Sequence, residues 1–284
     1  MIKISIIVTT YNRSNALALV LSALVAQENP LNFSFEVIIA DDGSTQATAE
    51  LIKQFQPRLP MQHIWQEDKG FRAAMARNRA IAASTGHYLI FLDGDCIPQT
   101  DFIVKHSKLA EKGWFVAGNR ILLSEKFTTQ TIRLSQKNTT LPFSEEKLGR
   151  IWTWPITQWF LPYLRRDINR LLPLLRLPDN FLRKYSQQKW QGAKTCNLAL
   201  WREDILKING FDERFQGWGH EDAELVVRLL RSGILRKEGR FSVPVLHLWH
   251  SEQDRHQEKA NRQRLEQMLK STTVIAQKGI KQYL

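Results

Sequence analysis

Short apolar runs alternate with helical patterns along the N-terminal part of the chain. The run at residues 4–8 is rich in β-branched side chains, which is typical of a buried strand. Leucine and valine then recur at helical spacing over residues 14–26, where Ser14 is placed to cap the helix. The alternation continues with strands at 35–40, 61–65 and 87–92 and helices at 48–55 and 71–84. It predicts an α/β fold in which helices flank a mostly parallel central sheet.

A polar cluster follows each predicted strand. Ligands of open α/β sheets bind beyond the carboxyl ends of the strands, so these clusters should converge on one crevice. Asp93-Gly94-Asp95 ends the fourth strand and carries two carboxylates out of the core together. Hard divalent cations prefer such oxygen ligands, and the motif therefore predicts a metal site. The other clusters are residues 9–13, 41–44 and 66–70.

The sequence lacks two common phosphate-binding loops. Gly-x-Gly-x-x-Gly does not follow the first strand and Gly-Lys-Ser/Thr does not occur, which disfavours a dinucleotide-dependent dehydrogenase and a P-loop NTPase. A sugar-nucleotide pyrophosphorylase would be expected to carry a Gly-rich, Lys-containing loop where residues 9–13 stand. Bound phosphates would therefore need a metal and basic side chains.

Length and composition indicate a globular chain that can form a full core, with 284 residues of which 43% are hydrophobic. Its cysteines are Cys96 and Cys196, and no N-terminal segment has the pattern of a signal peptide, so we expect a cytoplasmic setting. No apolar stretch approaches the ~20 residues of a spanning helix. Any membrane contact would be peripheral, at the inner face of the cell membrane.

The net charge of +12 predicts an anionic partner. The stretch from Arg150 to Lys194 contains nine Lys and Arg residues and two Asp residues. Four of the nine tryptophans lie among them. Basic residues among aromatic rings suit an anionic membrane surface. The same composition fits an irregular subdomain that packs its rings against the main core, or stacking on single-stranded nucleic acid.

Four motifs, in their order and spacing, resemble the family 2 glycosyltransferases of the GT-A fold. They are Thr9-Thr10-Tyr11-Asn12-Arg13, Asp41-Asp42-Gly43-Ser44, Ala76-Arg77-Asn78 and Asp93-Gly94-Asp95. A later stretch is similar to the acceptor-side half of inverting β-galactosyl- and N-acetylhexosaminyltransferases, including chondroitin-polymerase-like enzymes. It comprises residues 197–201, Gly210-Phe211-Asp212 and Trp218-Gly219-His220-Glu221-Asp222.

The resemblance implies one large domain with an insertion. Residues 1–120 would bind the nucleotide sugar, and residues 191–250 would bind the acceptor and hold the catalytic groups. Residues 121–190 would form the aromatic and basic insertion, a candidate membrane-docking segment. Residues 251–284 are predicted to form a charged helical tail.

For the donor, the resemblance implies a UDP-sugar held by the ends of the first two strands. Two alternatives stay open: residues 41–44 also fit an ordinary strand-to-helix turn with an Asp cap, and residues 77–78 fit a solvated helix face. Asp93 would bind the ribose or the sugar. The implied donor-binding residues are Thr10, Tyr11, Arg13, Asp42, Arg77, Asn78 and Asp93.

For the metal, the resemblance implies coordination by Asp95. His250 precedes Ser251, as does the metal histidine of β-1,4-galactosyltransferases, and His247 stands where that family has another ligand. Histidine ligands favour Mn²⁺ over Mg²⁺. Alternatively, each histidine is simply packed in a strand, after residues 243–246.

For catalysis, the resemblance implies Asp222 as the general base for inversion. Glu221 would hydrogen-bond the acceptor, the Trp218 ring would face the acceptor sugar, and Gly219 would allow a sharp turn. Alternatively, Glu221 and Asp222 are first-turn acids that complement a helix dipole.

The activity expected from these features is transfer of a hexose or N-acetylhexosamine to a glycan or lipid-linked glycan acceptor. Synthesis of bacterial surface polysaccharide or lipopolysaccharide would use such an enzyme, with no nucleic-acid partner. A non-enzymatic basic module that binds nucleic acid or an anionic membrane is the alternative, but it leaves Asp93, Asp95 and Asp222 without a role.

Overall fold

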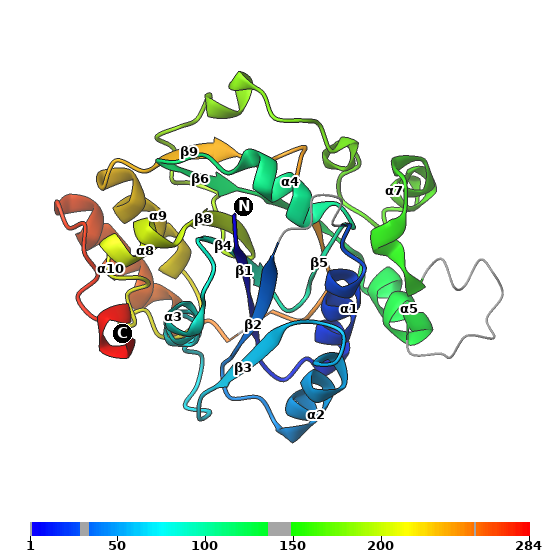
Figure 1. The fold of residues 1–284 in the computed structure, drawn as a ribbon, viewed down its shortest axis with the longest axis horizontal. Coiled ribbons are helices and arrows are strands. Elements are labelled where there is room, and N and C mark those ends of the chain that lie inside the picture. Colours follow the sequence, from blue (N-terminus) through cyan, green and yellow to red (C-terminus); the bar gives the residue numbers. More distant parts are fainter. Residues whose placement is uncertain (1, 29–33, 136–148, 253) are drawn as a thin grey trace.

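The computed structural model describes residues 2–28, 34–135, 149–252 and 254–284. Its centre is a seven-stranded sheet (Figure 1). The strand order is β3 (Met61–Trp65), β2 (Phe35–Asp41), β1 (Ile4–Thr10), β4 (Tyr88–Asp93), β8 (Asn197–Trp201), β6 (Trp114–Ala117) and β9 (Leu235–Glu238). Only β8 runs antiparallel to its neighbours β4 and β6 in this sheet. The predicted mostly parallel sheet flanked by helices is confirmed.

A smaller three-stranded sheet lies beside the carboxyl ends of the central strands. Its order is β5 (Cys96–Pro98), β10 (Pro244–His247) and β7 (Asn119–Leu122). β5 begins three residues after β4 ends, so this sheet holds the chain close to Asp93 and Asp95. It also brings His247 to the same place, since His247 pairs with Cys96.

Alternation along β1 explains the two apolar layers. Ile4, Ile6 and Val8 face the core that contains the leucines of α1, whereas Ile7 faces a second core shared with α3 and α9. The helices are α1 (Ser14–Val25), α2 (Gln46–Phe55), α3 (Ala73–Ala83), α4 (Phe102–Leu109), α5 (Glu125–Ser135), α7 (Phe160–Leu164), α8 (Arg202–Lys207), α9 (Glu221–Arg231) and α10 (Glu258–Lys270).

One helix start differs from expectation. Ser14 was expected to cap α1, but it is the first helical residue and Arg13 occupies the N-cap position without a side-chain hydrogen bond. Arg13 instead turns its guanidinium toward Asp95, with Nη1 2.9 Å from Oδ2. Arg13 therefore serves the cleft and not the helix end.

The segment after α5 is irregular, with short helices and many aromatic residues. Trp159 is fully buried and packs on Trp154 and Phe127, with ring centroids 4.9 Å and 6.1 Å away. Other apolar side chains of this segment, on α7 and near residue 181, stay exposed. Packing against the core thus explains some of its rings, and the others remain available for contact. Residues 136–148 of the predicted insertion lie outside the described residues.

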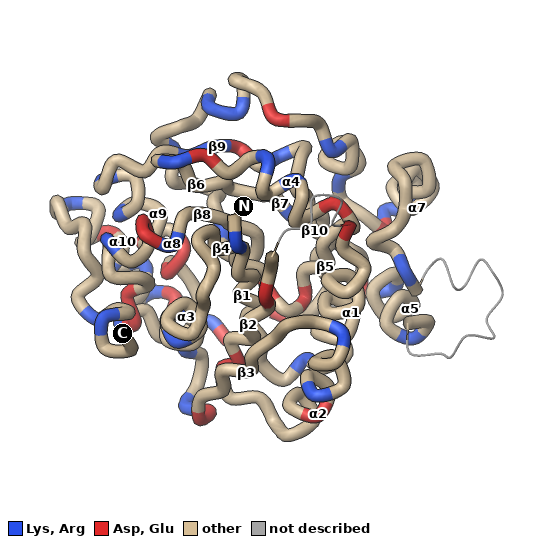
Figure 2. Tube along the Cα trace, in the orientation of Figure 1, with Lys and Arg blue, Asp and Glu red and all other residues tan. Residues whose placement is uncertain are grey.

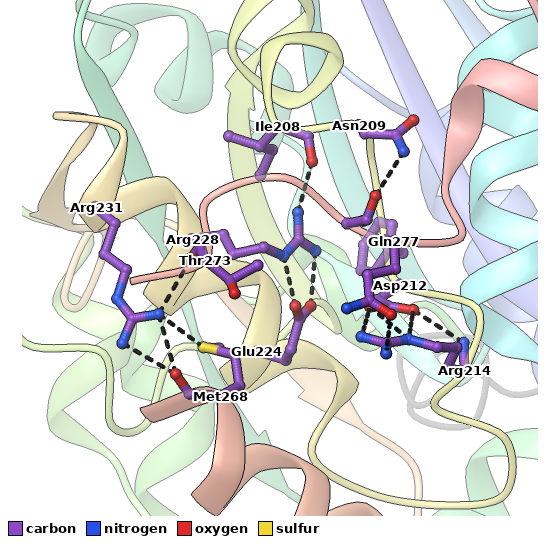
Figure 3. Close-up of polar contacts among 12 residues, drawn as sticks. Ile208, Asn209, Asp212, Arg214, Glu224, Arg228, Arg231, Met268, Thr273 and Gln277 are labelled. Atoms are coloured by element: carbon purple, nitrogen blue, oxygen red, sulfur yellow. Dashed lines mark hydrogen bonds and ion pairs between the residues drawn. The ribbon is translucent and has the colours of Figure 1, made fainter. Parts of the chain in front are cut away.

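The C-terminal tail contains a charged helix, α10, but its last residues pack into the core. α10 is followed by a non-helical stretch and by a 3₁₀ turn at Ile280–Tyr283, where Ile280 is completely buried. Figure 3 shows how polar contacts hold this region: Arg231 of α9 donates to the carbonyl oxygens of Met268 and Thr273, each at 3.1 Å.

Among the residues that the structure describes, none of the helices is long and apolar enough to cross a bilayer. Lys and Arg residues are spread over the trace (Figure 2), so the net charge of +12 does not by itself single out one surface.

Candidate active site

A cavity of about 560 Å³ opens at the carboxyl ends of β1 and β4. It is bounded by the start of α9 on one side and by the end of β10 on the other. The predicted site residues that line it are Thr10, Tyr11, Arg13, Asp42, Arg77, Asp93, Asp95, Trp218, Gly219, Glu221, Asp222, His247 and His250.

Asn78 was expected to form part of the donor site, but the structure places it outside this cavity. Its side chain is fully buried, donates to the carbonyl oxygen of Phe211 at 2.9 Å, and accepts from the Phe211 backbone N–H at 2.8 Å. It also donates to Glu213 at 3.0 Å. Asn78 follows Arg77 on α3 and so faces a different direction, where it fixes the chain that precedes the acceptor-side residues.

The end of β2 carries a buried carboxylate. Asp42 accepts hydrogen bonds from the Gln66 side chain and the Arg72 backbone N–H, both at 2.6 Å, and burial raises its pKa to about 6. Nearby, Thr10 Oγ1 is buried and has no partner among the described residues. Tyr11 is exposed and its hydroxyl donates to Asp68 at 2.8 Å. This end of the cavity thus offers polar atoms for a bound polar ring or hydroxyl.

Arg77 joins the two halves of the site. Its guanidinium is 3.3 Å from Asp93, 3.4 Å from Glu221 and 3.9 Å from Asp222 (Nη2–Oδ1, Nη1–Oε1 and Nη1–Oδ1). Only 5% of its side chain is exposed. Burial alone would lower the pKa of Arg77, but the carboxylates of Asp93, Asp222 and Glu221 outweigh it and raise the value. The solvated helix face considered for Arg77 is therefore wrong.

Asp95 and the two histidines form a compact set of oxygen and nitrogen ligands. Asp95 Oδ1 is 3.7 Å from His247 Nε2, and Asp95 Oδ2 is 3.5 Å from His250 Nε2. Burial lowers the pKa of His247 to about 4, so its imidazole is neutral and can ligate. One carboxylate and two imidazoles can ligate a divalent first-row metal ion, Mn²⁺ included. The residues present thus fit the implied divalent ion.

Glu221 and Asp222 open α9 at the opposite wall. Gly219 and His220 have φ values of 109° and 72°, and this left-handed turn starts the helix inside the cavity. Thr195 Oγ1 donates a hydrogen bond to Asp222 Oδ1. Burial, followed by the charge of Asp222, raises the pKa of Glu221 to about 7. Asp222 is more exposed, at 24% of its side chain against 11% for Glu221.

Several lining residues were not predicted. They include Arg120 of β7, Lys194, Trp190, Trp249 and Arg255. Thr195, which donates to Asp222, was not predicted either. Arg255 stacks over the Trp218 ring at 4.7 Å. The sequence could have pointed to three of these residues. Trp249 lies between the two predicted histidines, and Trp190 and Lys194 lie at the end of the basic and aromatic stretch 150–194. Arg120 carried no such signal.

Comparison with known families agrees with this geometry. The model described as "Glycosyl transferase family 2" matches residues 5–172, and that described as "N-terminal domain of galactosyltransferase" matches residues 178–244. The chain is therefore a glycosyltransferase of the GT-A fold. It belongs to glycosyl transferase family 2, as the motif resemblance indicated, and its C-terminal half carries the galactosyltransferase-like region.

Two curated relatives illustrate the range of the family. Validoxylamine A glucosyltransferase from Streptomyces hygroscopicus subsp. jinggangensis is 30% identical over 237 residues, which cover 81% of this chain and 52% of the relative. Chondroitin synthase from Escherichia coli is 29% identical over 237 residues, covering 81% and 32%. The chain thus spans about half or less of the length of these relatives.

Two solved structures share the fold. The mannosyltransferase PcManGT from Pyrobaculum calidifontis, in complex with GDP-Man and Mn²⁺, superposes with a TM-score of 0.58 at 18% identity, covering 94% of this chain and 63% of that one. S. aureus TarS 1–349 in complex with UDP gives 0.60 at 12% identity, covering 99% and 68%.

Proposed function

We propose that the chain is an inverting glycosyltransferase that moves a hexose or N-acetylhexosamine from a UDP-sugar to a hydroxyl of a glycan or lipid-linked glycan. The observation that carries the proposal is the placement of Asp222 and Asp95 in one cavity. Arg77 connects Asp222 to Asp93, and Asp95 faces the two histidines. A base and a leaving-group site are thereby held in fixed relation, as a single displacement requires.

In the proposed reaction, Asp222 takes the proton of the acceptor hydroxyl as its oxygen bonds to the anomeric carbon. The bond between that carbon and the diphosphate oxygen breaks, and its electron pair leaves with UDP. Thr195 orients the carboxylate of Asp222 through its hydroxyl. Glu221 and the Trp218 ring position the acceptor sugar.

Mn²⁺, or Mg²⁺ in its place, would be held by Asp95, His247 and His250 and would neutralise charge on the departing diphosphate. Arg13 and Arg120 line the same part of the cavity and add positive charge. Thr10, Tyr11 and Asp42 would hold the uridine, and Asp93 the ribose or donor sugar. The bound GDP-Man and Mn²⁺ of PcManGT, and the UDP of TarS, support a metal and a nucleotide diphosphate.

The direct test is hydrolysis of a panel of UDP-sugars with and without Mn²⁺. We expect slow, Mn²⁺-dependent cleavage of one UDP-sugar, because a transferase without acceptor can pass its donor to water. Replacing Asp95 with Asn should abolish the metal-dependent part. If no sugar nucleotide is cleaved and UDP binding does not respond to Mn²⁺, the proposal is wrong and a non-enzymatic basic module becomes the better account.

A specific surface favours a membrane-docking role in addition. α7 lies at the edge of the molecule (Figure 1), and its Phe160 and Leu164 are 57% and 61% exposed. Arg165, Arg166 and Arg170 follow directly and are exposed as well. Apolar side chains flanked by arginines suit the interface of an anionic bilayer. The enzyme would then act at the cytoplasmic face of the membrane, in surface polysaccharide or lipopolysaccharide synthesis.

Flotation with liposomes that contain anionic lipid tests this role. We expect the chain to float with such liposomes and not with zwitterionic ones. Replacing Arg165, Arg166 and Arg170 with Ala should reduce the bound fraction severalfold, since each basic residue near the surface contributes about 1 kcal/mol. A triple Lys→Ala variant on α10 and the tail (Lys259, Lys270 and Lys281) has the same change in charge and should float as the parent does. Equal loss in both variants would contradict a docking site at α7.

A further inference from the structure

The two cysteines of the chain lie together beside the proposed catalytic centre. Cys96 opens β5, and Cys196 directly precedes β8, which pairs with β4. Both are buried and both are free thiols. The Sγ atoms of Cys96 and Cys196 and a carboxylate oxygen of Asp93 all lie within 4.8 Å of one another. The reaction described above uses neither thiol, so the pair needs a separate explanation.

Cys96 also belongs to a second group of ligand atoms. Its Sγ lies within 4.8 Å of ligand atoms of Asp95 and His247, and its thiol is 3.6 Å from Asp95 Oδ1. The two groups therefore share one residue, while Cys196 belongs only to the first and His247 only to the second. Cys196 lines the cavity, which gives an ion a path from solvent.

We propose that Cys96, Cys196 and Asp93 form a second cation site, selective for a thiophilic divalent ion such as Zn²⁺ or Cd²⁺. Two thiolates and a carboxylate match the preference of these ions for sulfur, whereas Mn²⁺ prefers oxygen ligands and is disfavoured by a thiolate pair. Tetrahedral Zn²⁺ has Zn–S bonds of about 2.3 Å and Zn–O bonds of about 2.0–2.2 Å. The three ligand atoms already lie within 4.8 Å of one another, so small side-chain movements would bring them to these lengths, and the cavity leaves a fourth position for water.

Nearby charges suit such an ion. Two thiolates and one carboxylate around a divalent cation leave one net negative charge in a buried place. Arg120 lines the same cavity, and its positive charge would act favourably on both thiolates and supply the compensating charge. The site is therefore balanced by a residue that is already present.

Binding there has a consequence that rests on the proposed function. The carboxylate of Asp93 would turn away from Arg77 and the donor sugar and toward the ion. Cys96, which also lies beside Asp95 and His247, would move away from them. Zn²⁺ should therefore inhibit the transferase by occupying the neighbouring site.

The test is titration of the 284-residue chain with Cd²⁺, monitored by thiolate-to-metal charge-transfer absorption, after a thiol assay has confirmed two free thiols. We expect saturation at one equivalent. Cys96→Ser and Cys196→Ser should each weaken binding about 100-fold or more, because each removes a ligand. His247→Asn is the matched control: it should weaken Mn²⁺ binding, measured by electron paramagnetic resonance, and leave the Cd²⁺ absorption unchanged.

Cys196→Ser should show the opposite behaviour to His247→Asn: it should bind Mn²⁺ with the affinity of the parent. Its melting temperature should lie within a few degrees of the parent value. Absence of the absorption in the parent, or its persistence in both serine variants, would overturn the proposal. Inhibition of donor hydrolysis by Zn²⁺ is the second readout, and its half-maximal concentration should rise at least tenfold in Cys196→Ser. Binding without inhibition would leave the cation site standing and contradict only its link to the transferase.

Discussion

Replacing Asp222 with Asn should lower kcat for sugar transfer about 10³-fold, within the range found for loss of a general base. The amide keeps the shape of the side chain and can still accept the hydrogen bond from Thr195, but it cannot take a proton from the acceptor. Donor affinity should stay within about twofold of the parent value, because Asp222 lies on the acceptor side of Arg77. Initial rates with saturating donor, together with UDP titration, measure both effects.

Asp204→Asn provides a matched control. Asp204 and Asp222 are both acids in the first turn of a helix, where a helix dipole favours them, but Asp204 lies outside the cavity. If Asp222 were only a first-turn acid, the two variants should show similar small losses of stability and retain activity. Transfer by Asp222→Asn within tenfold of the parent would reject its assignment as the base.

The sequence predicts the central sheet well because its strands are buried on both faces. Such strands are continuous apolar runs, as at residues 88–92. Each run is followed by polar residues, which mark the end of the buried strand. The positions of Thr10, Asp42 and Asp95 at one sheet edge follow from this rule alone. The antiparallel direction of β8 does not, since its apolar pattern is the same in either direction.

The connections across the site could not be predicted in this way. Arg77 and Glu221 are 144 positions apart, and their contact depends on how α9 returns to the sheet. The meeting of Cys96 with Cys196 depends likewise on the pairing of β8 with β4. Arg77 and Asn78 carried the same local signal, yet one reaches the cavity and the other a buried backbone turn, because consecutive helical residues point about 100° apart.

The largest effect on stability is expected for Arg77→Met. Methionine nearly fills the same volume but leaves Asp93, Glu221 and Asp222 without their shared cation. Removing one partner from a buried charge cluster costs about 3–5 kcal/mol, and we expect the free energy of unfolding to fall by that amount. Arg79→Met makes the same change two residues further along α3, where the side chain is partly exposed, and should cost about 0.5 kcal/mol or less.

The pH dependence of the loss distinguishes lost charge from lost packing. Arg77 lowers the pKa of Glu221, which burial has raised to about 7, so removing Arg77 raises that pKa further. The folded variant then binds a proton that the unfolded chain releases near its ordinary, lower pKa, and its stability must fall as pH rises. Urea denaturation should therefore show a larger deficit relative to the parent at about pH 8 than at about pH 6. A deficit of equal size at both pH values would mean that Arg77 acts by packing alone, and the electrostatic link between the two halves of the site would have to be abandoned.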